Sequence, residues 1–266
     1  LADPRAARVK LRGETLHFLL EEVERAFGAA GAQFHIGGDD AGDIFIDHIG
    51  GDLTVAAVQF RLALTDRLAF VAYKDGYYWF DSTPVQDTGL ADIAAGVKYN
   101  FYRDVENQLY MTGGIGYQFD FGDSDVLQDD EELRLWFSAD KGFDRLHVGG
   151  VVNYFINTGT ESLLGSSDQR ISWHLHADYY VTDWFSPLVE VNGYHIVEEG
   201  TAAVPFSGVD AANLGGGQSE DVVTLGIGSE FRLGEGVAVR AAYEFELTDA
   251  ESLFGDRVTL SLTYNF

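Results

Sequence analysis

Residues 237–246 read VAVRAAYEFE, and residues 258–266 read VTLSLTYNF. In both segments, apolar or aromatic residues alternate with residues that are polar, charged or small. A period of two is typical of a β-strand whose two faces meet different surroundings. Each segment has about ten residues, which lets a tilted strand cross a lipid bilayer. The two segments therefore predict neighbouring transmembrane strands, and the aromatic Phe266 resembles the terminal assembly signal of outer-membrane barrels.

The same alternation recurs along most of the chain and predicts ten further strands. They cover residues 32–37, 43–64 (bent at Gly50-Gly51), 68–80, 90–101, 108–121, 132–140, 145–157, 170–181, 185–197 and 220–233. Short turns alternate with longer, acidic loops, as expected of periplasmic turns and outer loops. The sequence thus predicts an all-β protein: an antiparallel transmembrane β-barrel of about 12 strands in the bacterial outer membrane, with both termini on the short-turn side.

The composition is compatible with this fold. Aromatic residues make up 14% of the chain, and pairs such as Trp79-Phe80, Phe101-Tyr102 and Trp184-Phe185 fall near predicted strand ends, as in interfacial girdles. The sequence has no apolar run long enough for a transmembrane helix. A water-soluble β-sandwich would also alternate, but its strands are usually about five or six residues long.

The net charge of −26 argues against nucleic acid as a partner, because phosphates would be repelled. The absence of cysteine excludes disulfides and thiolate metal sites. We expect no resident cofactor. The acidic loop of residues 122–131 could hold calcium, or bridge to lipopolysaccharide through divalent cations, at Asp123, Asp125, Asp129 and Asp130. It lacks EF-hand spacing, so a solvated loop is the alternative. Expected partners are outer-membrane lipids and lipopolysaccharide, a small-molecule solute, and a protein at the outer loops or the periplasmic side.

Residues 1–30 form a separate segment before the barrel of residues 31–266. Residues 1–13 are basic, and Glu14 to Phe27 carry apolar residues at helical spacing. This short amphipathic helix is predicted to plug the lumen or to cover the periplasmic mouth as a lid. A surface helix or a mobile tail is the alternative.

The predicted strands place charged residues of both signs on the inner face. The pore-lining candidates are Arg61, Asp92, Lys98, Asp120, Arg134, His174, His176, Asp178, Glu190, Glu230, Arg232, Arg240, Glu244 and Glu246. Such charges either pair across strands and hold the wall together, or select the solutes that pass.

One group on this face could support chemistry: Ser172, His174, His176 and Asp178 share a face, with Glu190 and Asn192 expected on the next strand. A serine, a histidine and an acid are the parts of an acyl hydrolase. Two histidines and an aspartate could instead ligate a metal. Because the sequence provides no evident oxyanion hole or nucleophile turn, we expect lumen-lining residues and no enzyme.

Three segments resemble a known family. RLALTDRL (residues 61–68), ADIAAGVKY (residues 91–99) and the closing strand are similar to outer-membrane channels of the phenol-degradation meta-pathway (MetA-like) group. The resemblance covers residues 31–266. It implies twelve strands, an N-terminal segment inside the lumen, inward passage of small hydrophobic compounds, a lateral gap in the wall as a path, and no catalytic residues.

These observations favour a porin-like channel for passive uptake of small molecules, hydrophobic ones included. A structural or partner-binding outer-membrane barrel is the second hypothesis, and a membrane-embedded hydrolase is the third.

Overall fold

The computed structural model describes residues 31–36, 43–46, 51–74, 76–82, 86–90, 92–122, 131–159, 168–200, 221–234, 236–248 and 254–265. The N-terminal segment of residues 1–30, with its predicted helix, lies outside the described residues. The calcium candidates Asp123, Asp125, Asp129 and Asp130 lie outside them as well. Among the residues that are described, no helix combines the length and the apolar character needed to cross a membrane.

The described chain is built from β-strands. They are β1 (Gly31–Ile36), β2 (Asp43–Ile46), β3 (Gly51–Ala63), β4 (Leu68–Lys74), β5 (Gly76–Ser82), β6 (Gln86–Leu90), β7 (Ile93–Asp104), β8 (Leu109–Phe119), β9 (Glu132–Phe143), β10 (Leu146–Asn157), β11 (Gln169–Tyr179), β12 (Phe185–Glu198), β13 (Val222–Gly234), β14 (Val237–Glu246) and β15 (Phe254–Asn265).

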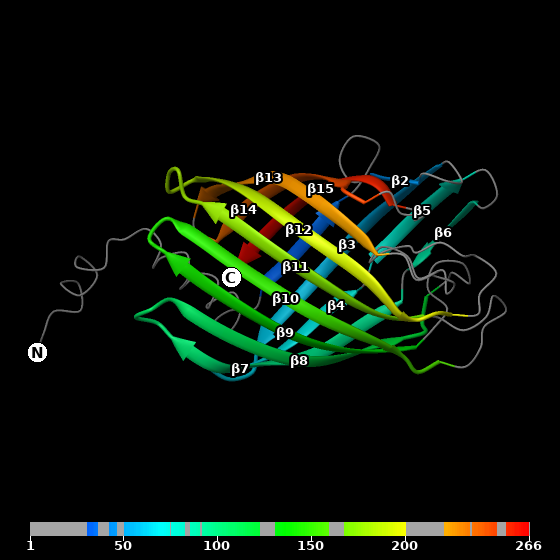
Figure 1. The fold of residues 1–266 in the computed structure, drawn as a ribbon, viewed down its shortest axis with the longest axis horizontal. Helices are drawn as coiled ribbons and strands as arrows, with labels where there is room; N and C mark the ends of the chain where they lie inside the picture. Colours follow the sequence, from blue (N-terminus) through cyan, green and yellow to red (C-terminus); the bar gives the residue numbers. More distant parts are fainter. Residues whose placement is uncertain are drawn as a thin grey trace, which may run out of the picture.

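All of these strands belong to one antiparallel sheet that closes on itself (Figure 1). From β7 to β15 every strand pairs with the next one along the chain. β1 then pairs with β15 on one side and with β3 on the other, with Gly31 opposite both Asn265 and Arg61. The sheet is therefore a barrel, as predicted, and the predicted closing strands are β14 and β15.

The described segments fill twelve positions in the wall. Three positions are each filled by two consecutive strands: β1 and β2 lie between β15 and β3, β4 and β5 both pair with β3, and β6 pairs with β5 as β7 pairs with β4. β3 and each strand from β8 to β15 fill one position alone. The prediction of about 12 strands is confirmed by this arrangement. The connections at the short-turn end are brief, whereas the strand ends that are farthest apart in sequence, such as Glu198 of β12 and Val222 of β13, are at the opposite end.

One predicted strand is wrong. Residues 43–64 do not form a single strand with a bend at Gly50-Gly51, because β2 runs antiparallel to β3, with Ile44 opposite Leu53. The chain reverses direction between Ile46 and Gly51. A pair of glycines suits a tight turn as well as a bulge, so the sequence signal was ambiguous.

A register change divides β4 from β5, where Lys74-Asp75-Gly76 interrupts the alternation of the sequence. In β4, Ala69 and Val71 are buried, whereas in β5 Tyr77 and Trp79 are exposed. All four are odd-numbered, so the inward face switches parity between the two strands. An extra residue of this kind is a bulge, which re-aims the side chains that follow it.

The two faces of the wall have opposite chemistry. Inward-facing positions on β11, β12 and β13 carry buried polar residues such as Ser172, Asn192 and Thr224. Outward-facing positions on the same part of the wall expose large apolar residues, including Leu175 and Ile227. A water-soluble protein shows the reverse distribution. An apolar outside around a polar inside is the pattern of a transmembrane barrel.

Aromatic side chains gather on the outer face at the two ends of the wall. At the short-turn end, the rings of Trp184 and Phe185 lie 6.3 and 5.2 Å from that of Phe231. At the opposite end, the Phe119 ring stacks on that of Phe121 at 5.7 Å, and Trp79 is exposed. Such belts place amphipathic rings at the two membrane interfaces.

Replacing Ile227 by arginine should lower the folding free energy of the barrel in lipid vesicles by about 2–4 kcal/mol. The side chain lies midway along β13 and faces outward, where a charge meets hydrocarbon. Leu233→Arg, at the interfacial end of the same strand, is the matched control and should cost about 0–1 kcal/mol. Equilibrium unfolding by urea in vesicles measures both, and equal costs would contradict the assigned membrane span.

Candidate functional site

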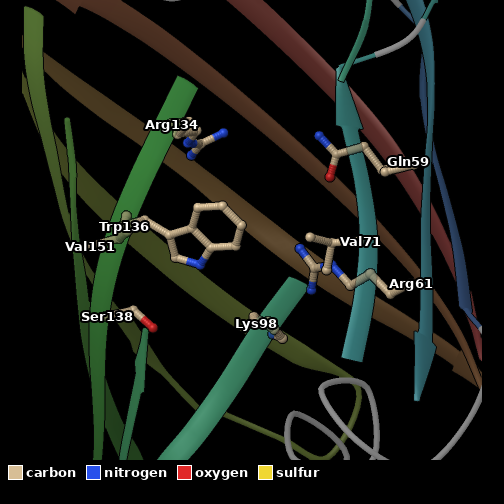
Figure 2. A pocket seen from close by; sticks show the side chains of 9 residues that line it. Gln59, Arg61, Val71, Lys98, Arg134, Trp136, Ser138 and Val151 are labelled. Atoms are coloured by element: carbon tan, nitrogen blue, oxygen red, sulfur yellow. The ribbon is translucent and has the colours of Figure 1, made fainter. Parts of the chain in front are cut away.

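A cavity of about 190 Å³ opens on the inner wall between β3, β4, β7, β9 and β10. Its lining includes three cationic side chains, Arg61, Lys98 and Arg134, and the indole of Trp136. No carboxylate is present among the described residues that line it. Figure 2 shows the Trp136 ring and the Arg61 guanidinium directed at the same space from opposite sides. The cavity therefore combines positive charge with a flat apolar surface.

The position of Trp136 depends on a glycine in the neighbouring strand. Gly114 of β8 pairs with Trp136 of β9. A Cβ atom built on Gly114 would lie 2.1 Å from two carbons of the indole. The ring therefore rests on the backbone of β8, a close approach that only glycine permits.

A chain of hydrogen bonds begins at the cavity and runs around the inner wall. Arg134 donates to Asn153 Oδ1 from Nε and Nη2, at 3.1 and 2.7 Å. Asn153 Nδ2 then donates to Ser172 Oγ at 2.9 Å. Ser172 Oγ lies 3.1 Å from His174 Nε2, and His174 Nδ1 lies 2.9 Å from Asn192 Oδ1. These contacts link β9, β10, β11 and β12.

Glu244 of β14 completes this chain. Its Oε1 accepts hydrogen bonds from Asn192 Nδ2, at 2.7 Å, and from the Thr224 hydroxyl. Its Oε2 accepts from Arg257 Nε of β15 at 2.9 Å. Asn192 reaches Glu244 across β13, whose inward residues there are small. A buried carboxylate with this many donors is satisfied, as a charge inside the wall must be.

A second group of titratable residues lies on β9, β10 and β11. The His147 ring nitrogen Nδ1 is 2.9 Å from Asp178 Oδ1, and Nε2 of the same ring is 3.7 Å from Asp140 Oδ1. His176 Nε2 lies 3.3 Å from His147 Nδ1. Ligand atoms of Asp140, His147 and His176 all lie within 4.8 Å of one another. We call these residues, together with Asp178, the histidine cluster.

Two ion-pair groups flank these networks. Arg170 lies 2.8 Å from Glu132 and 3.2 Å from Asp168, and its guanidinium lies over the Phe155 ring. Near the short-turn end, Glu230 lies 3.0 Å from Arg240 and 3.2 Å from Arg232. The Arg170–Glu132 and Arg240–Glu230 pairs join different strands, as in one of the two interpretations drawn from the sequence.

The predicted pore-lining residues separate into groups in the structure. Arg61, Lys98 and Arg134 meet at the cavity. His174 and Glu244 belong to the hydrogen-bonded chain, and His176 and Asp178 to the histidine cluster, with Glu190 opposite His176 in the register.

The remaining candidates lie toward the strand ends. Glu230, Arg232 and Arg240 form the group near the short turns. At the opposite end, buried Asp92 accepts from Gln118 Nε2, 3.0 Å away, and from backbone amides just beyond β8. Asp120 is exposed beyond the end of β8, and Glu246 accepts from the Thr248 hydroxyl at 2.8 Å.

The serine–histidine–acid arrangement considered from the sequence does not form among the described residues. The residue behind His174 is Asn192, a neutral amide, and Asp178 contacts His147 instead. The Ser172 hydroxyl already accepts from Asn153. The serine is therefore held in the wall network and is not presented as a nucleophile.

Sequence reasoning missed four residues that the structure makes prominent: Trp136, Asp140, His147 and Arg257. The expected strand ended at Asp140, whereas β9 continues to Phe143. A parity count along the full strands would have placed Trp136 and Asp140 inward with Arg134, and His147 inward with Asn153. No sequence signal shows which inward side chains meet across strands, because this depends on the register.

Neither a family model nor a curated protein matches the sequence. Among solved structures, the fold is similar to an outer-membrane channel from Pseudomonas putida F1, with a TM-score of 0.61 and 12% identity over 89% of this chain and 94% of that one. It is similar to the porin NanC, with a TM-score of 0.55 and 7% identity over 90% and 100% of the two chains. It is also similar to the translocator domain of the autotransporter NalP from Neisseria meningitidis, with a TM-score of 0.53 and 13% identity over 100% and 98%. At these identities the likeness establishes the fold, that of an outer-membrane β-barrel.

Replacing Glu244 by glutamine should lower the free energy of unfolding by about 1–3 kcal/mol. The amide keeps the shape but removes the charge that Arg257 faces, and its NH₂ group cannot accept from the donors around it. Glu246→Gln, the next inward position on β14, is the control and should change stability by about 0.5 kcal/mol or less. Urea unfolding in detergent micelles measures both; equal effects would show that the chain of hydrogen bonds does not centre on Glu244.

Proposed function

We propose that this protein is a channel of the bacterial outer membrane that lets small molecules enter the periplasm passively. The observation that carries the proposal is the cavity on a polar inner wall, inside a barrel whose outer face is apolar. A pore needs a wet, charged lining and supplies a path without chemistry. The likeness to a channel and a porin supports this function, although the same fold in the NalP translocator domain means that fold alone does not decide it.

The lining of the cavity suggests the kind of solute. Arg61, Lys98 and Arg134 favour an anionic group, because an opposite charge lowers the free energy of a permeating ion. Trp136 offers an apolar ring against which a flat molecule can stack. A small molecule with an apolar body and a carboxylate fits both features. The resemblance to the phenol-degradation channels, whose solutes are small and hydrophobic, supports the apolar part.

A structural or partner-binding barrel is the second candidate function. It is favoured by the hydrogen bonds and ion pairs that connect successive strands from β9 to β15. A scaffold needs a rigid wall and does not need an open lumen. The predicted protein partner and the divalent-cation contacts with lipopolysaccharide belong to outer loops that lie largely outside the described residues. They remain proposals.

Deleting residues 1–28 distinguishes the channel from the structural or partner-binding barrel. If the predicted N-terminal plug or lid closes a channel, the shortened protein should swell liposomes faster in isosmotic sugar solution than the full chain does. If the segment completes a sealed scaffold, the shortened protein should assemble poorly and cause no swelling. A fully assembled, impermeable barrel from both chains would contradict the channel.

The double variant Arg61→Gln/Lys98→Gln should shift the ion selectivity of the open channel toward cations. It removes two positive charges from the cavity, so the field that attracts anions weakens. The zero-current potential across a planar bilayer in a KCl gradient measures the shift. Arg67→Gln removes one positive charge in the exposed turn between β3 and β4 and should shift the potential less. Equal shifts per charge removed would place the selectivity outside the cavity.

A further inference from the structure

We propose that Asp140, His147 and His176 form a binding site for a divalent transition-metal ion on the inner wall. The site goes beyond the proposed channel and does not depend on conduction. It lies on three adjacent strands, β9, β10 and β11, and its ligand atoms lie within 4.8 Å of one another. An ion bound there would link the three strands and add two positive charges to the wall.

The backbone lets two of the proposed ligands approach each other. Gly149 of β10 lies opposite Asp140 on one side and opposite His176 on the other. A Cβ atom on Gly149 would lie 2.6 Å from Asp140 Oδ1 and 2.4 Å from His176 Cε1. The two side chains therefore converge above a residue that has no side chain, and His147 joins them from two positions along the same strand.

Asp178 prepares His147 to act as a ligand. A carboxylate accepts hydrogen bonds, so the contact of 2.9 Å between Asp178 Oδ1 and His147 Nδ1 requires the proton on Nδ1. The lone pair is then on Nε2, the atom that faces Asp140 Oδ1 at 3.7 Å. A carboxylate behind a ligating histidine is the usual outer partner in metal sites, where it fixes the tautomer and the ring orientation.

His176 Nε2 is also unprotonated, and its lone pair faces the N–H of His147, a contact that a bound metal ion would replace. His176 Nε2 lies 3.3 Å from His147 Nδ1. Because Nδ1 carries the proton that faces Asp178, His176 Nε2 can meet this atom only as an acceptor. The two imidazoles therefore both have an unprotonated Nε2, which is the form that binds a metal ion.

The donors and their spacing indicate the class of ion. Two imidazole nitrogens and one carboxylate oxygen suit zinc, nickel or copper, whereas calcium and magnesium prefer oxygen ligands. Tetrahedral zinc, with bonds of about 2.0–2.2 Å, needs donor atoms about 3.4 Å apart. The 3.7 Å between His147 Nε2 and Asp140 Oδ1 is close to this value. Three protein ligands leave a fourth position for water or an anion.

The ion can reach this site from the lumen. His147 is 3% exposed, but the Asp140 side chain is 37% exposed and forms the open side of the group. Entry of a cation is favoured there because Asp178 and Glu190 lie on the neighbouring strands.

The test is a calorimetric titration of the full chain, freed of metal with a chelator and held in detergent micelles, with zinc chloride. Excess calcium is present throughout to occupy sites made of carboxylates alone. We expect one zinc ion per chain. His176→Gln and Asp140→Asn each remove a ligand charge or nitrogen and should weaken zinc binding at least about tenfold, and Asp178→Asn, which removes the negative charge of the outer partner, about 10- to 100-fold.

His174→Gln is the matched control, because His174 faces inward on the same strand but bonds Ser172 and Asn192 outside the cluster. It should bind zinc as the wild type does. Circular dichroism verifies folding, and half-exposed Asp140→Asn carries the test if His176→Gln does not fold. Absence of saturable zinc binding in the wild type would overturn the site, and so would equal losses in His174→Gln and Asp140→Asn. Either result would leave the cluster as a hydrogen-bonded part of the wall.

Discussion

The structure depends on one constraint: every strand in the wall must find backbone partners on both sides, because hydrocarbon offers none. An unpaired amide or carbonyl within a bilayer costs several kcal/mol. β1 meets this constraint by pairing with β15 and β3 together, which turns a sheet with two edges into a cylinder with none. β2 occupies the same position in the wall as β1 and pairs with the same two neighbours. Once the cylinder is closed, the strand period divides the side chains between lipid and lumen.

This division explains why polar residues are buried here without weakening the protein. In a water-soluble domain a row of asparagine, serine, histidine and glutamate side chains would need a special explanation. In the row from Arg134 to Glu244 such residues face one another across strands, so each side chain hydrogen-bonds to the next. The row from Arg134 to Arg257 crosses β9 to β15 and gives the lumen a continuous hydrogen-bonded lining on that side. The cationic cavity begins at Arg134, at one end of this row.

The barrel, the number of wall positions and most inward-facing residues followed from alternation, because a period of two needs no knowledge of neighbours. The reversal between Ile46 and Gly51 could not be foreseen, since Gly50-Gly51 is equally suited to a bend within a strand. The groupings on the inner wall were also beyond the sequence. Asp178 and His147 are far apart in sequence and meet only because β10 and β11 pair in one particular register. Ser172, His174 and Asp178 share a face as expected, yet their partners come from β10 and β12, which a reading of β11 alone could not supply.

The bore of the lumen is governed in part by a residue that does not line it. None of the described lining residues of the cavity lies on β8, yet the Trp136 indole rests on Gly114 of that strand. Any larger side chain at position 114 would push the Trp136 ring toward Arg61 and reduce the width of the cavity between these two residues. Variation between related chains at this one backbone contact would therefore adjust the width of the pore while leaving its charges unchanged.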